Sequence, residues 1–178
     1  MTWQGWLQIA VFAALTTAVV KPLGLHIARC LDGTSRLVRA LAPLERGFFR
    51  LAGVDLAKEQ SWVEYAVAIL WFHLFGILAL YALQRAQAVL PLNPQQLHAV
   101  APDLALNTAV SFATNTSWQS YSGETTLSYL SQMAGITVQS FLSGAAGVAV
   151  AIALVRGFAR HGATTIGNFW VDVTRITL

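Results

Sequence analysis

The residues best suited to chemistry form one polar run without charge, Thr114-Asn-Thr-Ser-Trp-Gln-Ser-Tyr-Ser-Gly123, which Glu124 closes. The run lies in a chain of 178 residues that is 56% hydrophobic and only 11% charged, whereas an average soluble domain is about 25% charged. This composition indicates a membrane protein. Irregular backbone at membrane depth is tolerated only where it is buried in protein or lines water. A polar loop at that depth is therefore typical of an ion filter.

A short helix must position this loop. Pro102 and Asp103 can start and cap a helix, because proline suits a first turn and aspartate accepts backbone N–H groups there. Residues 104–112 would follow as helix. Nine residues at ~1.5 Å each reach about 13 Å, so this helix can enter the ~30 Å hydrocarbon core but cannot cross it. Its carboxyl end carries partial negative charge and would point at the loop, which favours a cation as the guest.

Three longer apolar stretches are expected to cross the membrane. Residues 3–20 and residues 127–155 contain no charged side chain. Residues 63–83 are apolar apart from Glu64 and His73. Each stretch approaches or exceeds the ~20 residues that a helix needs to span a bilayer.

The distribution of positive charge predicts the orientation of these helices. Seven Lys and Arg side chains lie between Lys21 and Lys58, one lies between the second and third spans, and three follow the third span. Because cytoplasmic loops carry the excess of Lys and Arg, the amino terminus is expected outside. The first positive charge follows the first apolar stretch, so residues 1–30 are expected to form an uncleaved transmembrane helix. The other segments are then cytoplasmic at 31–60, external at 84–124 and cytoplasmic at 157–178.

The basic segment 31–60 leaves two interpretations open. Its leucines and arginines recur at helical spacing, which favours a pair of amphipathic interfacial helices broken near Pro43, with arginines that meet lipid phosphates. A basic loop that only enforces the topology is the alternative. The net charge of +3 is explained by charges beside membrane spans, so we expect no nucleic-acid partner.

Small and polar residues recur every three or four positions along the last span, at Ser128, Gln132, Gly135, Gln139, Ser143 and Gly147. We expect them to share one helical face. Such a face could line a water path, or it could let two helices pack closely.

Signatures of catalysis are missing from the sequence. It contains no Gly-x-Ser-x-Gly, His-Glu-x-x-His or Gly-x4-Gly-Lys-Ser/Thr motif, so we expect no catalysis by the chain itself. The single cysteine, Cys30, allows no internal disulfide, and we interpret it as structural and not as part of a metal site. We interpret His73 as a packed histidine that is hydrogen-bonded to its neighbours, with a haem ligand or a proton relay as the alternative.

Two sequence stretches resemble a known family, the potassium-binding (A) subunit of the bacterial Kdp potassium-transporting P-type ATPase. The loop Thr114-Asn-Thr-Ser-Trp-Gln-Ser-Tyr-Ser-Gly-Glu124 closely resembles that family's first filter loop. The stretch Gly167-Asn-Phe-Trp-Val-Asp-Val-Thr-Arg175 resembles the entry to its next repeat, and residues 45–53 and the first helix are also similar. The resemblance covers essentially the whole chain. The family's usual filter has Asn where this chain has Ser117, a change that coordination by backbone carbonyls should tolerate.

The resemblance implies an all-α membrane fold. An extra amino-terminal helix would precede one repeat, at 61–156, that consists of a helix, a re-entrant pore loop and a helix, as in potassium channels. Four such repeats would surround one pore, so the chain would be a fragment or truncated product that leads into a missing next span. A four-chain assembly of single repeats is the alternative.

The resemblance also implies the ion, the site and the partners. The ion would be potassium, with filter carbonyls from Thr114, Asn115, Thr116 and Ser117 and with Gln119 and Glu124 at the external mouth. ATP would be cleaved by a separate catalytic P-type ATPase subunit, and small accessory membrane subunits would complete the complex in the bacterial inner membrane.

Two further alternatives stay open for the external segment. Glu124 could raise the local concentration of cations, or it could hold the loop as a hydrogen-bond partner. The chain could also be a membrane scaffold or a small-molecule binding module, in which residues 101–124 form an external cap.

Overall fold

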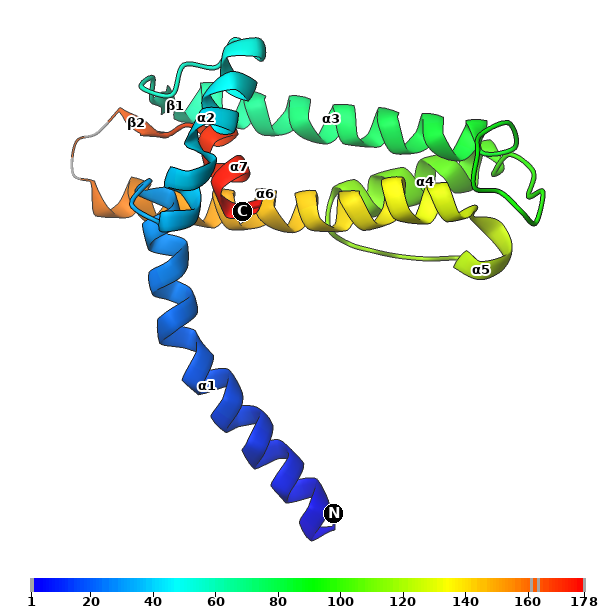
Figure 1. The fold of residues 1–178 in the computed structure, drawn as a ribbon, viewed down its shortest axis with the longest axis horizontal. Coiled ribbons are helices and arrows are strands. Elements are labelled where there is room, and N and C mark those ends of the chain that lie inside the picture. The colour runs from blue at the N-terminus through cyan, green and yellow to red at the C-terminus, as the bar shows by residue number, and fades with distance from the viewer. Residues whose placement is uncertain (1, 161, 163, 178) are drawn as a thin grey trace. The chain divides into compact units, whose positions relative to one another are not determined.

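The computed structural model describes residues 2–160, 162 and 164–177, which form two units (Figure 1). The first unit runs to Val54, and the second comprises Asp55–Thr177. Three helical stretches among the described residues, which begin at Trp3, Trp62 and Ser131, are long and apolar enough to cross a membrane. The expected all-α fold is confirmed, with the addition of one short two-stranded ribbon.

The first unit contains two helices, α1 (Trp3–Leu31) and α2 (Arg36–Leu51). Helix α1 is apolar and exposed over most of its length, as suits a surface that faces lipid. Helix α2 is amphipathic, and it buries Val38 and Phe49 on one face. This favours the helical interpretation of the basic segment over a plain loop.

The expected break of the basic segment at Pro43 is wrong. Helix α2 continues through Pro43 as one helix. A proline inside a helix removes one backbone hydrogen bond and displaces a carbonyl. Pro43 is exposed, so the displaced carbonyl can turn outward.

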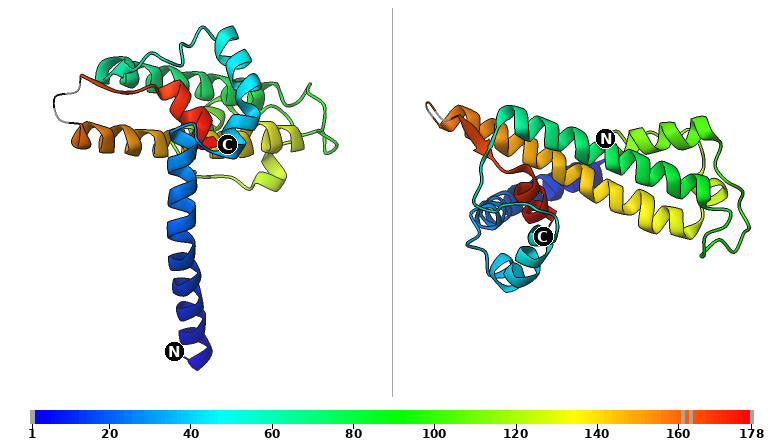
Figure 2. Two further views of the ribbon diagram at one scale, coloured as in Figure 1. Left: turned by 60° about the vertical axis from the view of Figure 1, so that its left-hand side comes forward. Right: turned by 90° about the horizontal axis from the view of Figure 1, so that it is seen from above.

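The second unit is built on two long antiparallel helices that lie side by side (Figure 2). The first is α3 (Trp62–Ala86). The second begins as the π-helix η1 (Ser131–Thr137) and continues as α6 (Val138–Ala159). Between them in the sequence come α4 (Pro102–Ala113), which packs against α3, and the single turn α5 (Gly123–Thr126).

Helix α3 has a well-defined start. The Ser61 hydroxyl accepts a hydrogen bond from the Glu64 N–H at 3.3 Å, and the Glu64 carboxylate accepts one from the Ser61 N–H at 2.8 Å. This capping box satisfies two N–H groups that a helix start leaves free. We call the end of the unit that holds α4 and α5 the loop end, and the opposite end the ribbon end.

The ribbon end carries structure that the sequence did not predict. Strand β1 (Gln60–Ser61) pairs antiparallel with β2 (Thr165–Gly167). Helix α7 (Phe169–Thr177) follows and packs against α6 and α3. Its Phe169 side chain meets the rings of Tyr65 and Phe72 edge to face, in a core that also contains the alanines of α6.

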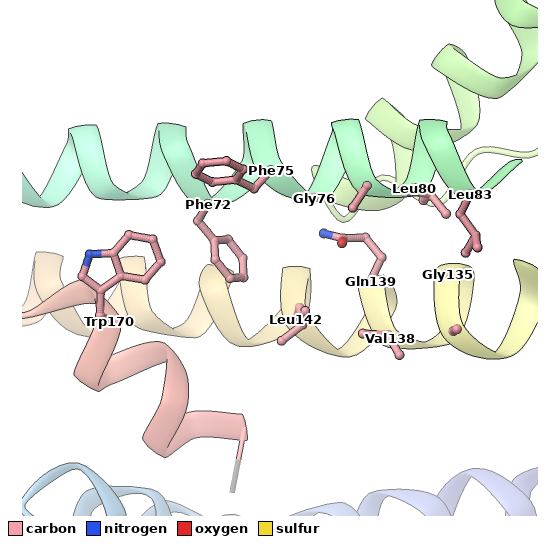
Figure 3. Close-up of a pocket in the computed structure, with 12 residues that line it drawn as sticks. Phe72, Phe75, Gly76, Leu80, Leu83, Gly135, Val138, Gln139, Leu142 and Trp170 are labelled. Atoms are coloured by element: carbon pink, nitrogen blue, oxygen red, sulfur yellow. The ribbon is translucent and has the colours of Figure 1, made fainter. Parts of the chain in front are cut away.

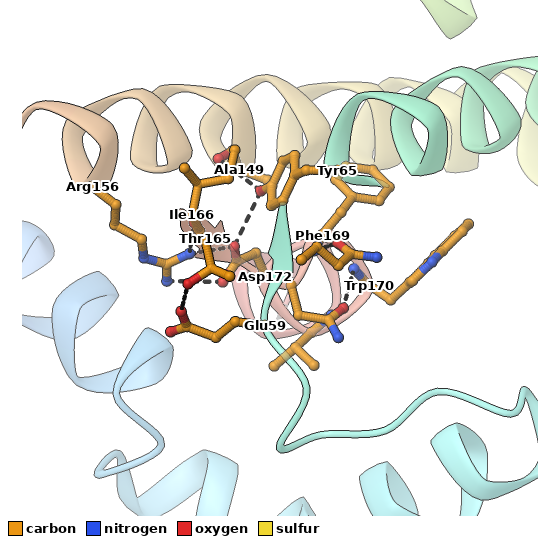
Figure 4. Close-up of polar contacts among 12 residues, drawn as sticks. Glu59, Tyr65, Ala149, Arg156, Thr165, Ile166, Phe169, Trp170 and Asp172 are labelled. Carbon is orange, nitrogen blue, oxygen red and sulfur yellow. Dashed lines mark hydrogen bonds and ion pairs between the residues drawn. The ribbon is translucent and has the colours of Figure 1, made fainter. Parts of the chain in front are cut away.

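A network of charges and hydroxyls joins the elements of the ribbon end (Figure 4). The Arg156 guanidinium donates to both carboxylate oxygens of Asp172, at 2.5 Å and 3.0 Å. The Tyr65 hydroxyl lies 3.1 Å from Asp172 Oδ2 and 3.0 Å from the Ala149 carbonyl oxygen. The Asp172 side chain is only 5% exposed. This pair therefore fastens α7 to α6 and, through Tyr65, to α3.

Gly167 makes room for this network. Its φ is +114°, a region that residues with a side chain rarely adopt. A Cβ atom at this position would lie within 2.1 Å of Arg156 Nη1. The position therefore requires glycine both for its backbone angle and for the approach of the guanidinium.

The stripe of small and polar residues on the last span does not form the single face that we expected. Ser128 precedes the helix, and Gly147 is exposed. The π-helix η1 changes the angular position of the residues that follow it, because its turn is wider than that of an α-helix. Only part of the stripe faces α3.

That part of the stripe serves mainly for packing (Figure 3). A Cβ atom added at Gly135 would lie 2.7 Å from a Leu80 methyl group, and one added at Gly76 would lie 2.8 Å from the Gln139 amide nitrogen. Beside these contacts a cavity of about 500 Å³ lies between α3 and α6 and is lined mostly by apolar side chains. Close helix packing, one of the two interpretations, explains Gly135.

Candidate cation-binding loop

Helix α4 directly precedes the candidate loop, residues 114–117. Its 12 residues correspond to about 18 Å, which is well short of a bilayer core. One face, which includes Ala105, Ala109 and Phe112, is buried in the second unit. The helix ends at Ala113 and Thr114 caps it, so its carbonyl end points into residues 114–117.

The backbone N–H groups of the loop turn back onto the last turn of α4. Thr114 N–H donates to the Val110 carbonyl at 3.0 Å, and Asn115 N–H donates to the Phe112 carbonyl at 3.3 Å. The N–H groups of Thr116 and Ser117 both donate to the Ser111 carbonyl, at 2.9 Å and 3.1 Å. These bonds satisfy carbonyls that a helix end leaves without partners.

The carbonyl groups of residues 114–117 are left free. Among the described residues, no donor bonds to any of these four carbonyl oxygens, and all four residues are exposed. The sign of φ alternates, with −90° at Thr114 and +59° at both Asn115 and Ser117. Two left-handed residues without glycine are uncommon in so short a stretch, and such backbone strain gathers at functional sites.

Ser111 is the residue that holds the loop, and the sequence interpretation missed it. Its hydroxyl donates to the Trp118 carbonyl at 3.1 Å and accepts a hydrogen bond from the Trp118 N–H. Its own carbonyl binds two further N–H groups of the loop. Ser111 is 7% exposed. It therefore positions the loop from its buried side.

Side chains of the loop add two contacts. The hydroxyl oxygens of Thr114 and Thr116 lie 3.0 Å apart. The Ser143 hydroxyl donates to Asn115 Oδ1 at 3.4 Å. The second contact ties the loop to α6, so Ser143, a member of the expected stripe, contacts the candidate filter.

The two residues expected at the mouth are both exposed. Gln119 follows the filter segment, and Glu124 lies in α5. Among the described residues, the Glu124 carboxylate has no hydrogen bond or ion pair. The Gln132 amide holds this part of the chain instead, since it donates to the carbonyls of Gly123 and Leu127 at 3.2 Å and 3.1 Å.

Gln87 closes the loop end from the side of α3. Its amide nitrogen donates to the carbonyls of His98 and Thr126, at 2.6 Å and 2.9 Å. Its amide oxygen accepts from the Ser128 N–H and the Ser131 hydroxyl, each at 3.1 Å. All four hydrogen-bonding positions of this fully buried amide are filled. Sequence reasoning gave no indication of this role.

The chemistry available at the loop is neutral coordination by oxygen. Residues 114–118 include no titratable side chain, and their backbone carbonyls and hydroxyl groups are neutral oxygen ligands. Among the described residues, no group of three His, Cys, Asp or Glu side chains could hold a metal ion. The Nδ1–H group of His73 donates to the Ile69 carbonyl at 2.8 Å within its own helix, which agrees with a packed histidine.

These elements define a class of protein, an all-α membrane protein in which two long apolar helices flank a half-length helix and a loop of free backbone carbonyls. Sequence comparison identifies the family. Residues 10–178 match the family model described as the potassium-transporting ATPase A subunit. The chain belongs to this family.

Relatives with high identity carry the name potassium-transporting ATPase potassium-binding subunit. The protein of Methylobacterium radiotolerans is 58% identical, that of Rhodospirillum centenum is 59% identical and that of Chromobacterium violaceum is 54% identical, each over 179 aligned residues. The alignments cover 100% of this chain. The chain spans only 30% to 31% of the length of these curated relatives.

Proposed function

We propose that the chain is part of a potassium-binding and potassium-translocating subunit, and that residues 114–117 supply one segment of its filter. The observation that carries the proposal is the direction of the loop's hydrogen bonds. Each N–H group of the segment bonds to α4, whereas the four carbonyl oxygens are exposed and free. Free carbonyl oxygens can replace the hydration shell of a potassium ion, as in potassium-channel filters. Coordination by Thr114, Asn115, Thr116 and Ser117 follows, with Gln119 and Glu124 at the mouth.

One loop can form only one side of a coordination shell. The relatives are about three times as long as this chain, so the proposal places further helix, pore loop, helix repeats in the rest of the protein. A loop alone in lipid would leave its carbonyls without partners, at a cost of several kcal/mol for each group. Neighbouring loops and the bound ion would remove that cost.

The proposal assigns ATP hydrolysis to other chains. The name of the relatives describes the potassium-binding subunit of a potassium-transporting ATPase, which distinguishes ion binding from ATP hydrolysis. A catalytic P-type ATPase subunit would therefore cleave ATP, and small accessory membrane subunits would complete the assembly. The setting is the bacterial inner membrane with the amino terminus outside, as the distribution of Lys and Arg predicts.

Two substitutions at one position test whether the left-handed backbone presents the carbonyls. In the full-length transporter, Ser117→Gly keeps access to a φ of +59°, and we expect its apparent potassium affinity to stay within about twofold of the wild type. Ser117→Val is β-branched and disfavours that angle by about 1–3 kcal/mol, so we expect a loss of about tenfold. Equal affinity for the two variants would rule out this role of the backbone.

A cysteine at Thr116 tests the scaffold alternative, in which residues 101–124 are an external cap. A filter position inside the assembled protein should not react with a bulky, charged thiol reagent, and potassium should leave the reaction slow. Glu124→Cys is the matched control, because its position at the mouth should react readily. If Thr116→Cys reacts as fast as Glu124→Cys, the cap explains the segment better.

A further inference from the structure

The turn that joins α1 to α2 forms a basic pocket, which lies entirely within the first unit. Its volume is about 560 Å³. The side chains that matter for its chemistry are His26, Arg29, Thr34, Ser35, Arg36 and Arg39. Nothing in the proposed transport function uses this pocket.

The arginines of the basic pocket, Arg29, Arg36 and Arg39, are free of ion pairs with the described part of the chain. Arg39 donates from Nη2 and Nε to the Thr34 carbonyl at 2.6 Å and 3.2 Å, which fixes its guanidinium beside the turn. An arginine fork with free N–H groups is suited to an oxyanion.

Helix α2 adds its own positive end to the basic pocket. It is 16 residues long, and its first turn contains no acidic residue and receives no capping bond from a side chain. Among the described residues, no acceptor bonds to the N–H groups of residues 36–38. Free N–H groups and the helix dipole together favour an anion at this place.

Ser35 gives the second, independent observation. This residue lines the pocket and is only 6% exposed, yet its hydroxyl has no hydrogen-bond partner among the described residues. The hydroxyl oxygen is not among the fully buried atoms that lack a partner, so this oxygen is open to the pocket although the residue is otherwise enclosed. An oxygen atom of a ligand in the basic pocket would accept from it.

We propose that the basic pocket binds a phosphate group, which the headgroup of an anionic phospholipid supplies. Phosphate offers several oxygen acceptors, enough for two arginines, the Ser35 hydroxyl and the first turn of α2. Helix α1 has 29 residues, about 43 Å, so its last turn lies beyond a ~30 Å hydrocarbon core and at the level of the headgroups. A free phosphate ion has the same chemistry and is the other possible source.

The test measures binding of phosphatidylglycerol to the full-length protein in detergent by native mass spectrometry. Arg29→Gln/Arg36→Gln removes two charges from the basic pocket, and we expect the affinity to fall by at least about tenfold. Arg46→Gln/Arg50→Gln is the matched control, because it removes two charges from the exposed side of α2 outside the pocket. Its affinity should change less than about twofold. Ser35→Ala keeps every charge and removes no cap, so a loss of about threefold would identify the hydroxyl contact.

The comparison between the two arginine pairs decides the outcome. A selective loss in the pocket pair supports the site, and displacement of the lipid by inorganic phosphate would show that the soluble ion also enters it. An equal loss in both pairs would overturn the proposal, because diffuse attraction of the basic segment would explain it. No loss in either pair would overturn it as well. Thermal unfolding of each variant confirms that it is folded.

Discussion

The two ends of the second unit are held by different kinds of interaction. At the ribbon end, Arg156 and Asp172 form a buried ion pair, and Arg160 and Glu59 form a more exposed one. At the loop end, the described residues form no ion pair. Neutral side chains, namely Ser111, Gln87 and Gln132, hold the chain from Thr126 back to the loop, and the one charged group that contributes, the Arg85 guanidinium, bonds to the Val100 carbonyl before α4.

This difference follows from what each end is proposed to do. A carboxylate fixed behind the filter segment would attract a cation away from the carbonyls, and a guanidinium there would repel it, since a unit charge at 4 Å is worth about 1 kcal/mol even in water. Neutral hydroxyl and amide groups hold backbone without adding such a field. The ribbon end has no ion to present, so an ion pair can provide its rigidity.

The largest expected effect comes from breaking the buried ion pair at the ribbon end. Asp172→Ala leaves the Arg156 guanidinium without its partner, which should lower the free energy of unfolding by about 3–5 kcal/mol. Thermal and denaturant unfolding of the full-length protein measure this. Glu59→Ala is the control, because the Arg160–Glu59 pair is 41% and 44% exposed and should cost at most about 1 kcal/mol. Similar losses in the two variants would contradict a buried ionic anchor.

The corresponding change at the loop end is Ser111→Ala. It leaves the Trp118 N–H and carbonyl without their shared partner, which should cost about 1–3 kcal/mol of local stability. Because this hydroxyl positions the filter segment, we expect the apparent potassium affinity of the full-length transporter to fall about tenfold. Ser140→Ala is the control, since that hydroxyl bonds only to the Ile136 carbonyl of its own helical stretch. Unchanged affinity in Ser111→Ala would show that the loop does not depend on its anchor.

Adding a positive charge at the proposed mouth tests why neutral groups hold residues 114–117. Gln119→Arg should place a positive charge close to the entering ion, at a cost of about 1 kcal/mol, so the apparent potassium affinity should weaken about fivefold. High salt should reduce this effect. Gln95→Arg adds the same charge at an exposed position of the segment before α4 and should have little effect. If the two variants change the potassium affinity equally, Gln119 does not lie at the mouth.

The smallest expected effect is a dependence on acid at the ribbon end. The Thr165 hydroxyl and then the Arg160 guanidinium hold the pKa of Glu59 below its usual value of 4.5. A carboxyl group with a lowered pKa in the folded protein contributes stability above pH 4.5, and this contribution is lost as the pH falls through the lower pKa of the folded state. The exposed pair should contribute less than about 1 kcal/mol. Glu59→Gln should remove this part of the pH dependence in unfolding measurements.

The long helices and the short one could be predicted because their signals are local. Charge-free runs of about 20 residues indicate spans, and an apolar run of nine residues after Pro102 indicates a helix too short to cross. The errors concern features of the fold that such local signals do not show. The interpretation of the last span assumed 3.6 residues per turn throughout, whereas residues 131–137 form a π-helix. Strands of two and three residues are too short to show alternation.

The residues that hold the candidate site could not be found from the sequence. Ser111 stands in an apolar helix, where one serine has no particular meaning, and its partner Trp118 depends on the path of the loop between them. Gln87 bonds to groups up to 44 residues away. The polar run itself was visible as uncharged residues after a short helix, and its role as a filter stays a prediction.

The bonds of Gln87 and Tyr65 also fix an order of events during synthesis of the chain. The hydrogen bond between Gln87 and Ser131 can form only after 44 more residues have been synthesised. At the usual rates of translation this takes roughly 2–9 s. The hydrogen bond between Tyr65 and Asp172 can form only after 107 more residues have been synthesised, which takes roughly 5–21 s. The hydrogen bonds of Gln87 at the loop end can therefore form while α7 is still being made, before the ion pair of the ribbon end exists.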